Sequence, residues 1–443
     1  MENKQYFDTD RLIITYFRQS LPVVFSMAVT LVYNLVDTYF IGRTNDAALV
    51  AGVSLCGPLF MMLMAVGNIF GQGGSSLIAR MLGKGDRDSA ARISAYCFYG
   101  AILAGAVIAV LLMCFRFPCL KLLGADAQTL PHAASYYTVL ALASPAAVLT
   151  FIHSNLLRSE GLSALSVIGM IAGSVLNIIL DPIMITVLGW GARGAAVATA
   201  LGYILTDVLY IFIVKRKSAC LSMDIKAGHV NGEERRQILS IGLSAAITNI
   251  ASSVCMIVMY NYLSGYGNEK IAALGIVTRI ISVIQLVIIG FSFGAVPLFG
   301  YLYGAREKEK LKKLLRFCTC FLCGLALAIS LLMFAFAVPL VRVFIGHEAV
   351  IEAGTQMLRW QVSGMVFAAV VLLFTCFFQG TGKAVLAFVM SLSRQGLLFL
   401  VLFSIATAVF GFAGFLASQL AADFLSAVLA LLLYRNLQQR ISA

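Results

Sequence analysis

Apolar residues follow one another along this chain in long stretches that leave little room for polar positions. A helix that crosses a membrane needs about 20 consecutive apolar residues, and about twelve stretches of the chain reach that length. They cover residues 14–41, 49–79, 93–115, 133–155, 163–187, 193–214, 238–264, 271–303, 317–341, 355–378, 384–408 and 411–434. The pattern predicts an all-α integral membrane protein with twelve transmembrane helices and both termini on the same side.

The composition agrees with a multi-pass membrane protein. Hydrophobic residues make up 60% of the 443 residues and charged residues only 12%, whereas soluble proteins carry about 25% charged residues. The longest polar connection, 215–237, is too short for a soluble domain. Residues 1–10 lack the basic start, short apolar core and cleavage site of a secretory signal, so we expect the first span to direct insertion.

Basic residues are distributed unevenly between the connections. The net charge is +12, and most Lys and Arg residues, Arg158 among them, lie in segments on the side of both termini. Loops rich in Lys and Arg stay in the cytoplasm, so we expect both termini to be cytoplasmic and the protein to span the plasma (inner) membrane. The basic cluster 306–316 is expected to contact anionic lipids. The charge therefore signals topology, and we expect no nucleic-acid partner.

The two halves of the chain resemble each other at an offset of about 222 residues, half the chain length. Met81-Leu-Gly-Lys-Gly-Asp86 matches Leu302-Tyr-Gly-Ala-Arg-Glu307, and Leu157-Arg-Ser-Glu-Gly161 matches Phe378-Gln-Gly-Thr-Gly382. Six spans per half give both halves the same orientation, so we expect two six-helix lobes related by a pseudo-twofold axis along the membrane normal. The predicted amino-terminal lobe is 1–214, the cytoplasmic linker 215–237 and the carboxy-terminal lobe 238–443, with a binding cavity between the lobes of one monomer.

An aspartate, Asp37, interrupts the first apolar stretch. A carboxylate near the middle of a bilayer costs about 3 kcal/mol or more, and chains keep one mainly where it faces a bundle interior or a wet cavity and handles ions or protons. Asn34 lies three residues earlier and therefore shares its helix face. The alternative is an aspartate near a helix end that reaches water or bonds a neighbouring helix.

A second acid, Asp181, lies in the fifth stretch, one helical turn after Asn177. One carboxylate and one amide oxygen on the same face suit sodium or a shared proton. Thr199 in the sixth stretch adds a hydroxyl, and Asn155 ends the fourth. The alternative is that Asp181-Pro182 only ends a helix near the outer face.

The carboxy-terminal half lacks this polar set. At the repeat offset, Asp37 corresponds to Tyr260 and Asp181 to Leu402. We therefore expect ion or proton coupling in the amino-terminal lobe. Asp207 and Asp423 have no visible partner in the sequence and are interpreted as interfacial.

Motifs for catalysis or nucleotide hydrolysis are absent from the sequence. It has four histidines, no H-E-x-x-H and no P-loop. The ten cysteines show no disulfide framework, and Cys318, Cys320 and Cys323 lie in an apolar span where they favour helix packing. Gly71-Gln-Gly-Gly74 also lies in an apolar span and favours close helix contact. We expect no enzyme, no cofactor and no firm metal site.

Several motifs together resemble the multidrug and toxic compound extrusion (MATE) family, and in particular its bacterial MepA-like branch. They are Asn34-Leu-Val-Asp-Thr-Tyr-Phe-Ile-Gly42, Ala51-Gly-Val-Ser, Gln72-Gly-Gly, Gly83-Lys-Gly-Asp86, Leu157-Arg-Ser-Glu-Gly161 and Asn177-Ile-Ile-Leu-Asp181-Pro. The resemblance covers the whole chain. It implies export of bulky, often cationic, drugs and dyes in exchange for protons or sodium.

The resemblance also implies roles for individual residues. Asp37, Asn155, Asn177 and Asp181 match the polar cluster that the family uses for coupling, with Thr199 a looser match. Pro22 matches the first-span proline associated with bending of that helix. The acids that one branch of the family places in its carboxy-terminal lobe are missing here, which argues against a sodium site in that lobe. If sodium rather than the proton is the coupling ion, its expected ligands are Asp37, Asn177 and Asp181.

Span positions give candidates for the wall of the substrate cavity, where aromatic and Met side chains make adaptable contacts. They are Tyr33, Met61, Met64, Met256, Tyr260 and Phe291. The competing transporter hypothesis is a flippase for a lipid-linked saccharide, which would favour several arginines in the cavity. The sequence places only Arg279 and Arg394 within spans.

Overall fold

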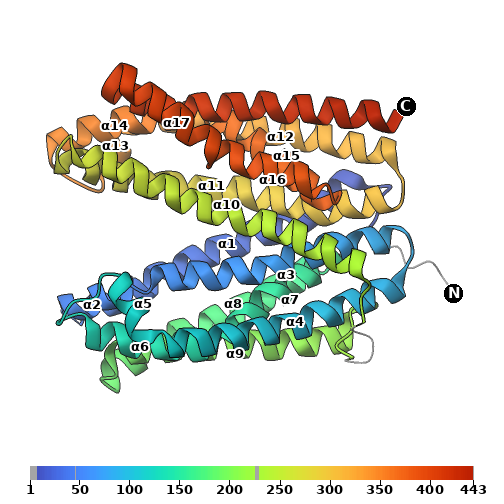
Figure 1. Cartoon of the computed structure of the whole chain (residues 1–443), viewed down its shortest axis with the longest axis horizontal. Coiled ribbons are helices and arrows are strands. Elements are labelled where there is room, and N and C mark those ends of the chain that lie inside the picture. Colours follow the sequence, from blue (N-terminus) through green and yellow to red (C-terminus); the bar gives the residue numbers. More distant parts are fainter. Residues whose placement is uncertain (1–6, 45, 225–228, 443) are drawn as a thin grey trace.

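A computed structural model describes residues 7–44, 46–224 and 229–442, which form helices joined by short connections (Figure 1). Residues 225–228 of the predicted linker and the first six residues of the amino-terminal segment lie outside the described residues. The first half contains α1 Leu12–Gly42, α2 Ala47–Ser54, α3 Gly57–Gly83, α4 Arg87–Cys114, α5 Arg116–Leu122, α6 Leu130–Leu142, α7 Ser144–Ser159, α8 Ser163–Asp181, the π-helix η1 Pro182–Val187 and α9 Gly191–Lys217. The second half contains α10 Gly232–Ser264, α11 Asn268–Gly304, α12 Lys308–Ala335, α13 Ala337–Arg342, α14 Glu348–Ser363, α15 Met365–Gly380, α16 Ala384–Arg394 and α17 Leu397–Ser442.

These helices supply the predicted twelve membrane passes. Within the described residues, nine helices are long and apolar enough to cross a membrane, and two bent helix pairs raise the number to eleven. The last of the nine, Ala384–Gln439, has 56 residues, far more than the about 20 that one pass requires. Its backbone leaves helical geometry at Gly411 (φ 56°, ψ −130°). Figure 1 shows that α17 runs in two arms, the second of which turns back along the bundle. The all-α prediction and the twelve spans are confirmed.

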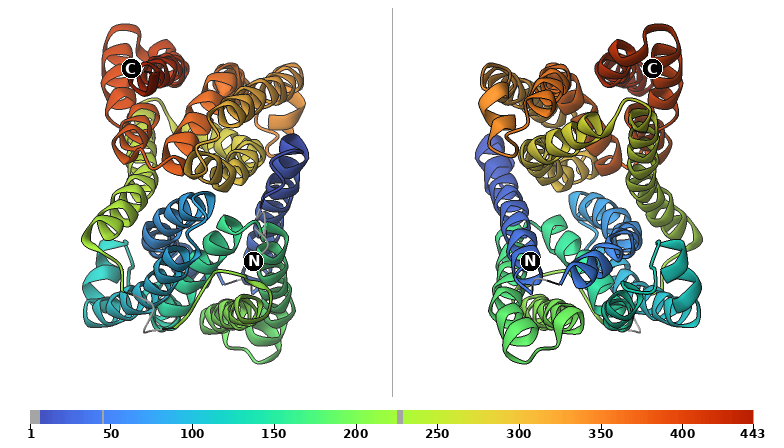
Figure 2. Two further views of the ribbon diagram at one scale, coloured as in Figure 1. Left: turned by 90° about the vertical axis from the view of Figure 1, so that its right-hand side faces the viewer. Right: turned by 90° about the vertical axis from the view of Figure 1, so that its left-hand side faces the viewer.

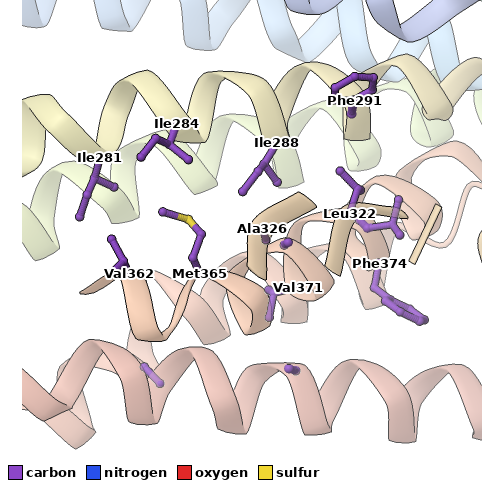
Figure 3. Packing of buried hydrophobic residues seen from close by; sticks show 14 of the residues in the cluster. Ile281, Ile284, Ile288, Phe291, Leu322, Ala326, Val362, Met365, Val371 and Phe374 are labelled. Carbon is purple, nitrogen blue, oxygen red and sulfur yellow. The ribbon is translucent and has the colours of Figure 1, made fainter. Parts of the chain in front are cut away.

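The helices form two lobes that lie beside each other (Figure 2). The first lobe contains α1–α9, and its core is built largely from α3, α4, α6 and α7, with Leu77, Ile93 and Tyr137 fully buried. The second lobe contains α10–α17. Figure 3 shows part of its core, where Ile281 and Ile284 of α11 point toward Val362 and Met365.

Two predicted spans are bent pairs rather than straight helices. The predicted span 133–155 is α6 followed by α7, with a 54° bend, and 355–378 falls on α14 followed by α15, with a 47° bend. Pro145 lies in the first turn of α7, where its missing N–H ends the hydrogen-bond pattern of α6. Pro58 has the same position in α3 and separates it from α2.

Glycines allow the two lobes to meet backbone to backbone at one end. A Cβ atom at Gly73 would lie 2.0 Å from the Ile238 carbonyl oxygen, and one at Gly83 would lie 2.0 Å from that of Tyr301. The hydroxyl of Ser76 donates to the Gln379 carbonyl over 2.5 Å. These contacts lie toward the end of the bundle where α9 connects to α10 (Figure 1), which we call the linker end. The Gly71–Gly74 segment is thus adjacent to a close helix contact, as its sequence predicts.

Candidate functional site

A cavity of about 750 Å³ lies between the lobes. Its wall is formed by α1, α3, α7, α8 and α9 of the first lobe and by α10, α11, α15 and α16 of the second. Amide side chains reach the wall from both lobes, including Asn68, Asn249 and Gln285. The cavity has room for a bulky organic molecule, and its polar groups allow many alternative hydrogen bonds.

The most deeply buried acid of the first lobe lies next to this cavity. Asp181 is 0% exposed and Asn177 2% exposed. The Asn177 Nδ2 atom donates to Asp181 Oδ1 at 3.3 Å and to Thr199 Oγ1 at 3.4 Å. Asn177 and Thr199 themselves line the cavity, so Asp181 lies directly behind the wall.

Local backbone features place this acid. Asp181 is the last residue of α8, and Pro182 after it begins the π-helix η1. Proline has no N–H to continue the α-helical bonding, and π-helical turns of this kind are common at functional sites. A Cβ atom at Gly173 would lie 2.6 Å from the Gly202 carbonyl oxygen. This close approach of α8 and α9 brings Asn177 within reach of Thr199.

Asp37 approaches the same group from α1. Its carboxylate interacts electrostatically with Asp181 and with Tyr33, Tyr136 and Tyr203. We call Asp37, Asn177, Asp181 and Thr199 the acid cluster. The three tyrosines come from α1, α6 and α9. Sequence reasoning missed Tyr136 and Tyr203, because a tyrosine in an apolar stretch gives no signal of its partners.

Among the residues that the structure describes, three oxygens of the acid cluster have no hydrogen-bond partner. They are Asp37 Oδ1, Asn177 Oδ1 and Asp181 Oδ2, and all three atoms are buried. Buried polar atoms are nearly always hydrogen-bonded, so such a group of acceptors indicates a site that takes up a ligand. Carboxylate and amide oxygens suit a proton or a small hard cation. The described residues contain no group of three or more His, Cys, Asp or Glu side chains that would hold a transition metal.

The other predicted coupling residues lie apart from these contacts. Asn155 lines the cavity and donates to the Phe151 carbonyl at 2.7 Å, close to Gly71. Asn34 lines the cavity from an exposed position on α1. Pro22 lies inside α1, which continues as a helix on both sides of it.

Of the six predicted cavity residues, Tyr33 and Met64 line the wall. Met61 is 53% exposed, and neither it nor Met256 nor Tyr260 is among the described lining residues. Phe291 is 8% exposed and packs against Phe321 with ring centroids 5.0 Å apart. Phe293 lines the cavity instead, because two positions along a helix differ by about 200° in direction.

The interpretation of Asp207 and Asp423 as interfacial is wrong. Asp207 is 5% exposed and accepts a hydrogen bond from Thr150 Oγ1 at 2.8 Å. Asp423 is 2% exposed and forms an ion pair with Arg394, Nε to Oδ1, at 2.9 Å. The turn at Gly411 brings Asp423 to Arg394. The sequence does not indicate the direction of that turn.

Comparison with known proteins gives the family. The MatE family model matches residues 22–183 and again residues 244–405, about half the chain further on. The multidrug export protein MepA of Staphylococcus aureus strain N315 is 30% identical over 441 residues, covering 100% of this chain and 97% of the relative. The MepA protein of Staphylococcus saprophyticus is 29% identical with the same coverage.

Solved structures agree with this assignment. A crystal structure of MATE in the bent conformation has a TM-score of 0.91 and 24% identity, covering 100% of this chain and 98% of that one. A MOP superfamily transporter from Pyrococcus furiosus has a TM-score of 0.88 and 25% identity, covering 97% and 96%. With the family model matched in both halves and a 30% identical relative aligned along the whole chain, this protein belongs to the MATE family of membrane transporters.

Proposed function

We propose that this chain is a multidrug exporter that moves bulky organic compounds, cationic ones included, out of the cell in exchange for protons or sodium ions. The observation that carries the proposal is the acid cluster, in which Asn177 and Thr199 line the central cavity and Asp181 lies behind them. Three buried oxygens of this cluster have no hydrogen-bond partner among the described residues. The full-length similarity to proteins named multidrug export protein supports the same activity.

The position of α1 suggests how the cation and the substrate are coupled. Toward its start, α1 packs against the second lobe, where the Tyr16 hydroxyl donates to the Phe291 carbonyl at 3.2 Å. Toward its end, α1 carries Asp37 of the acid cluster. Pro22 lies between these two regions and removes one backbone hydrogen bond. A cation that binds the acid cluster more tightly in one arrangement of α1 than in another shifts the population between them.

The contacts between the lobes indicate a direction of opening. The glycine contacts at Gly73, Gly83 and Gly242 all lie toward the linker end. If that end is cytoplasmic, as the distribution of basic residues predicts, the structure is closed to the cytoplasm and represents the outward-facing state. We infer that both termini and the linker 215–237 are cytoplasmic and that the lobes 1–214 and 238–443 rock against each other.

The test is efflux of ethidium from proteoliposomes, with a pH gradient and a sodium gradient imposed separately. We expect one gradient to drive efflux by the wild type and Asp37→Asn to abolish it, because the amide cannot exchange the proton or balance the ion's charge. Glu352→Gln, an exposed acid on α14, is the control and should retain efflux. Full gradient-driven efflux by folded Asp37→Asn contradicts the proposal.

A flippase for a lipid-linked saccharide is the second candidate. Arg158 and Arg394 both line the cavity, and arginine side chains bind phosphate groups in a bidentate manner. If neither gradient moves ethidium, transbilayer movement of a fluorescent lipid pyrophosphate is the next measurement.

A further inference from the structure

The charged side chains on the cavity wall are arginines. Among the described residues that line the cavity, only Arg158 and Arg394 carry a full charge, and no carboxylate reaches the wall. Asp181 lies behind Asn177 and Thr199. The surface that a substrate touches therefore carries two guanidinium groups and is otherwise formed by neutral side chains. The sequence predicts Arg279 within a span and Arg158 in a cytoplasmic segment. In the structure, Arg279 is exposed and is not among the described wall residues, whereas Arg158 is.

The two arginines differ in how their charge is balanced. The Arg394 Nε atom donates to Asp423 at 2.9 Å, so this pair is close to neutral. Arg158 has no carboxylate oxygen within 4.0 Å anywhere in the described part of the chain. Its hydrogen bonds, both 3.0 Å long, go to the carbonyl and hydroxyl oxygens of Ser154 on its own helix.

The acid nearest to Arg158 along the chain is engaged elsewhere. Glu160 accepts hydrogen bonds from the backbone N–H groups of Ala219 and Cys220, at 2.6 and 3.1 Å, and from the Ser218 hydroxyl at 2.5 Å. These bonds hold the segment that follows α9. Glu160 therefore serves the connection between the lobes, and the Arg158 charge stays uncompensated.

An uncompensated guanidinium on a cavity wall inside a membrane protein is costly unless an anion joins it. Neutral polar side chains line the same cavity. Ser154 and Asn155 flank Arg158 on α7, and Gln72 on α3 follows Gly71, whose Cβ position would lie 2.9 Å from the Asn155 Nδ2 atom. The planar fork of arginine matches a carboxylate in a bidentate manner. The amides and the hydroxyl beside it add neutral donors.

We propose that Arg158 binds an anionic group of the exported compound, so that the cavity prefers amphipathic molecules that carry a carboxylate, zwitterionic drugs in particular, over the same cation without one. This inference rests on the proposed export function and narrows its substrate class. The positive part of such a molecule would be attracted to Asp181, which lies behind the wall residues Asn177 and Thr199.

The test compares two dyes that differ at a single group. Rhodamine 6G is an ethyl ester and a pure cation, and rhodamine 19 is the corresponding free acid. Fluorescence polarisation measures the binding of each to the purified full chain without a gradient. We expect the wild type to bind the acid about tenfold more tightly than the ester, as one charge-assisted hydrogen-bond pair allows. Arg158→Gln should bring this ratio close to one, and Arg279→Gln should leave it unchanged.

Two further results decide between recognition and a structural role. Arg158 also lies in the last turn of α7, where a positive charge stabilises the helix end. If Arg158→Gln weakens both dyes equally, the role is structural and the proposal is overturned. Arg158→Lys keeps the charge but loses the fork, so it should retain part of the preference. If Arg158→Gln does not fold, the wild type alone still tests the proposal. A wild type that binds rhodamine 19 no more tightly than rhodamine 6G overturns it.

Failure of this inference is distinguishable from failure of the export function. Export of rhodamine 6G and of rhodamine 19 from proteoliposomes is measured for the wild type and for Arg158→Gln. If the wild type exports neither dye under either gradient, the export function fails, whereas the acid preference in binding stands or falls separately. If the wild type exports both dyes and Arg158→Gln keeps the wild-type binding ratio, only the Arg158 assignment fails.

Discussion

The two lobes share an architecture but differ in whether their buried carboxylates are paired with a basic residue. In the first lobe, Asp37 interacts electrostatically with Asp181, and each carboxylate has an oxygen without a hydrogen-bond partner among the described residues. In the second lobe, Asp423 is paired with Arg394 and also accepts a hydrogen bond from Gln419 at 3.1 Å. The same fold therefore contains one interior that can take up a cation and another whose charge is already neutralised. This difference supports our proposal that coupling takes place in the first lobe alone.

The largest expected effect concerns the acid cluster. Asp181→Asn should reduce gradient-driven export to background, because the variant keeps the shape of the site and loses its negative charge. Folding should be retained, since no described basic residue forms an ion pair with Asp181. Export in proteoliposomes and thermal unfolding in detergent measure the two effects. Gradient-driven export at the wild-type rate by the folded variant would contradict this comparison.

The ion pair of the second lobe should behave in the opposite way. Arg394→Met leaves Asp423 buried and unpaired, which costs about 3–5 kcal/mol of stability. The double variant Arg394→Met/Asp423→Leu removes both charges and should regain most of that loss. Unfolding midpoints of the single and double variants test this. Equal destabilisation by both would mean that the pair does not act as a unit.

The close approach of α8 and α9 should be sensitive to volume. A Cβ atom at Gly173 would lie 2.0 Å from Thr206 Oγ1, so Gly173→Val should separate the helices and cost about 1–3 kcal/mol. Export should fall as well, because Asn177 loses Thr199. Gly324→Val in the second lobe is the control, since nothing lies within 4 Å of its Cβ position. An unaffected Gly173→Val protein would show that this contact does not organise the acid cluster.

A smaller effect is expected from the hydroxyl of the acid cluster. Thr199→Val removes the acceptor of one Asn177 hydrogen bond, and the net value of such a bond is about 1 kcal/mol. Gradient-driven export should therefore fall about fivefold at limiting gradient. Thr375→Val, which changes a hydroxyl on the cavity wall of the second lobe, should have less effect. A stronger export defect in Thr375→Val than in Thr199→Val would indicate coupling in the second lobe and contradict this account.

The sequence predicts most of the fold because membrane spans are set by local composition. Asn177 and Asp181 share a helix face by spacing alone, so their proximity was predictable. Tyr136 and Tyr203 were missed, because only the packing of α6 and α9 brings them to Asp37.

Other errors have the same tertiary origin. Phe291 and Phe293 are equally apolar, and the rotation of α11 decides which one faces the cavity. Asp423 looks unpaired until the chain reverses at Gly411 and meets Arg394. Arg158 follows an apolar stretch and looks like a loop residue, although it lines the cavity wall. Pairings between distant helices depend on lobe geometry, which local patterns do not encode.

The central claim is that coupling resides in the first lobe and not in the second. Its most direct test is gradient-driven ethidium export by two double variants in matched proteoliposomes. Asp37→Asn/Asp181→Asn should show no export under either gradient, and Arg394→Gln/Asp423→Asn should still export with the coupling ion of the wild type. Export by the first variant together with loss of coupling in the folded second variant would contradict the account.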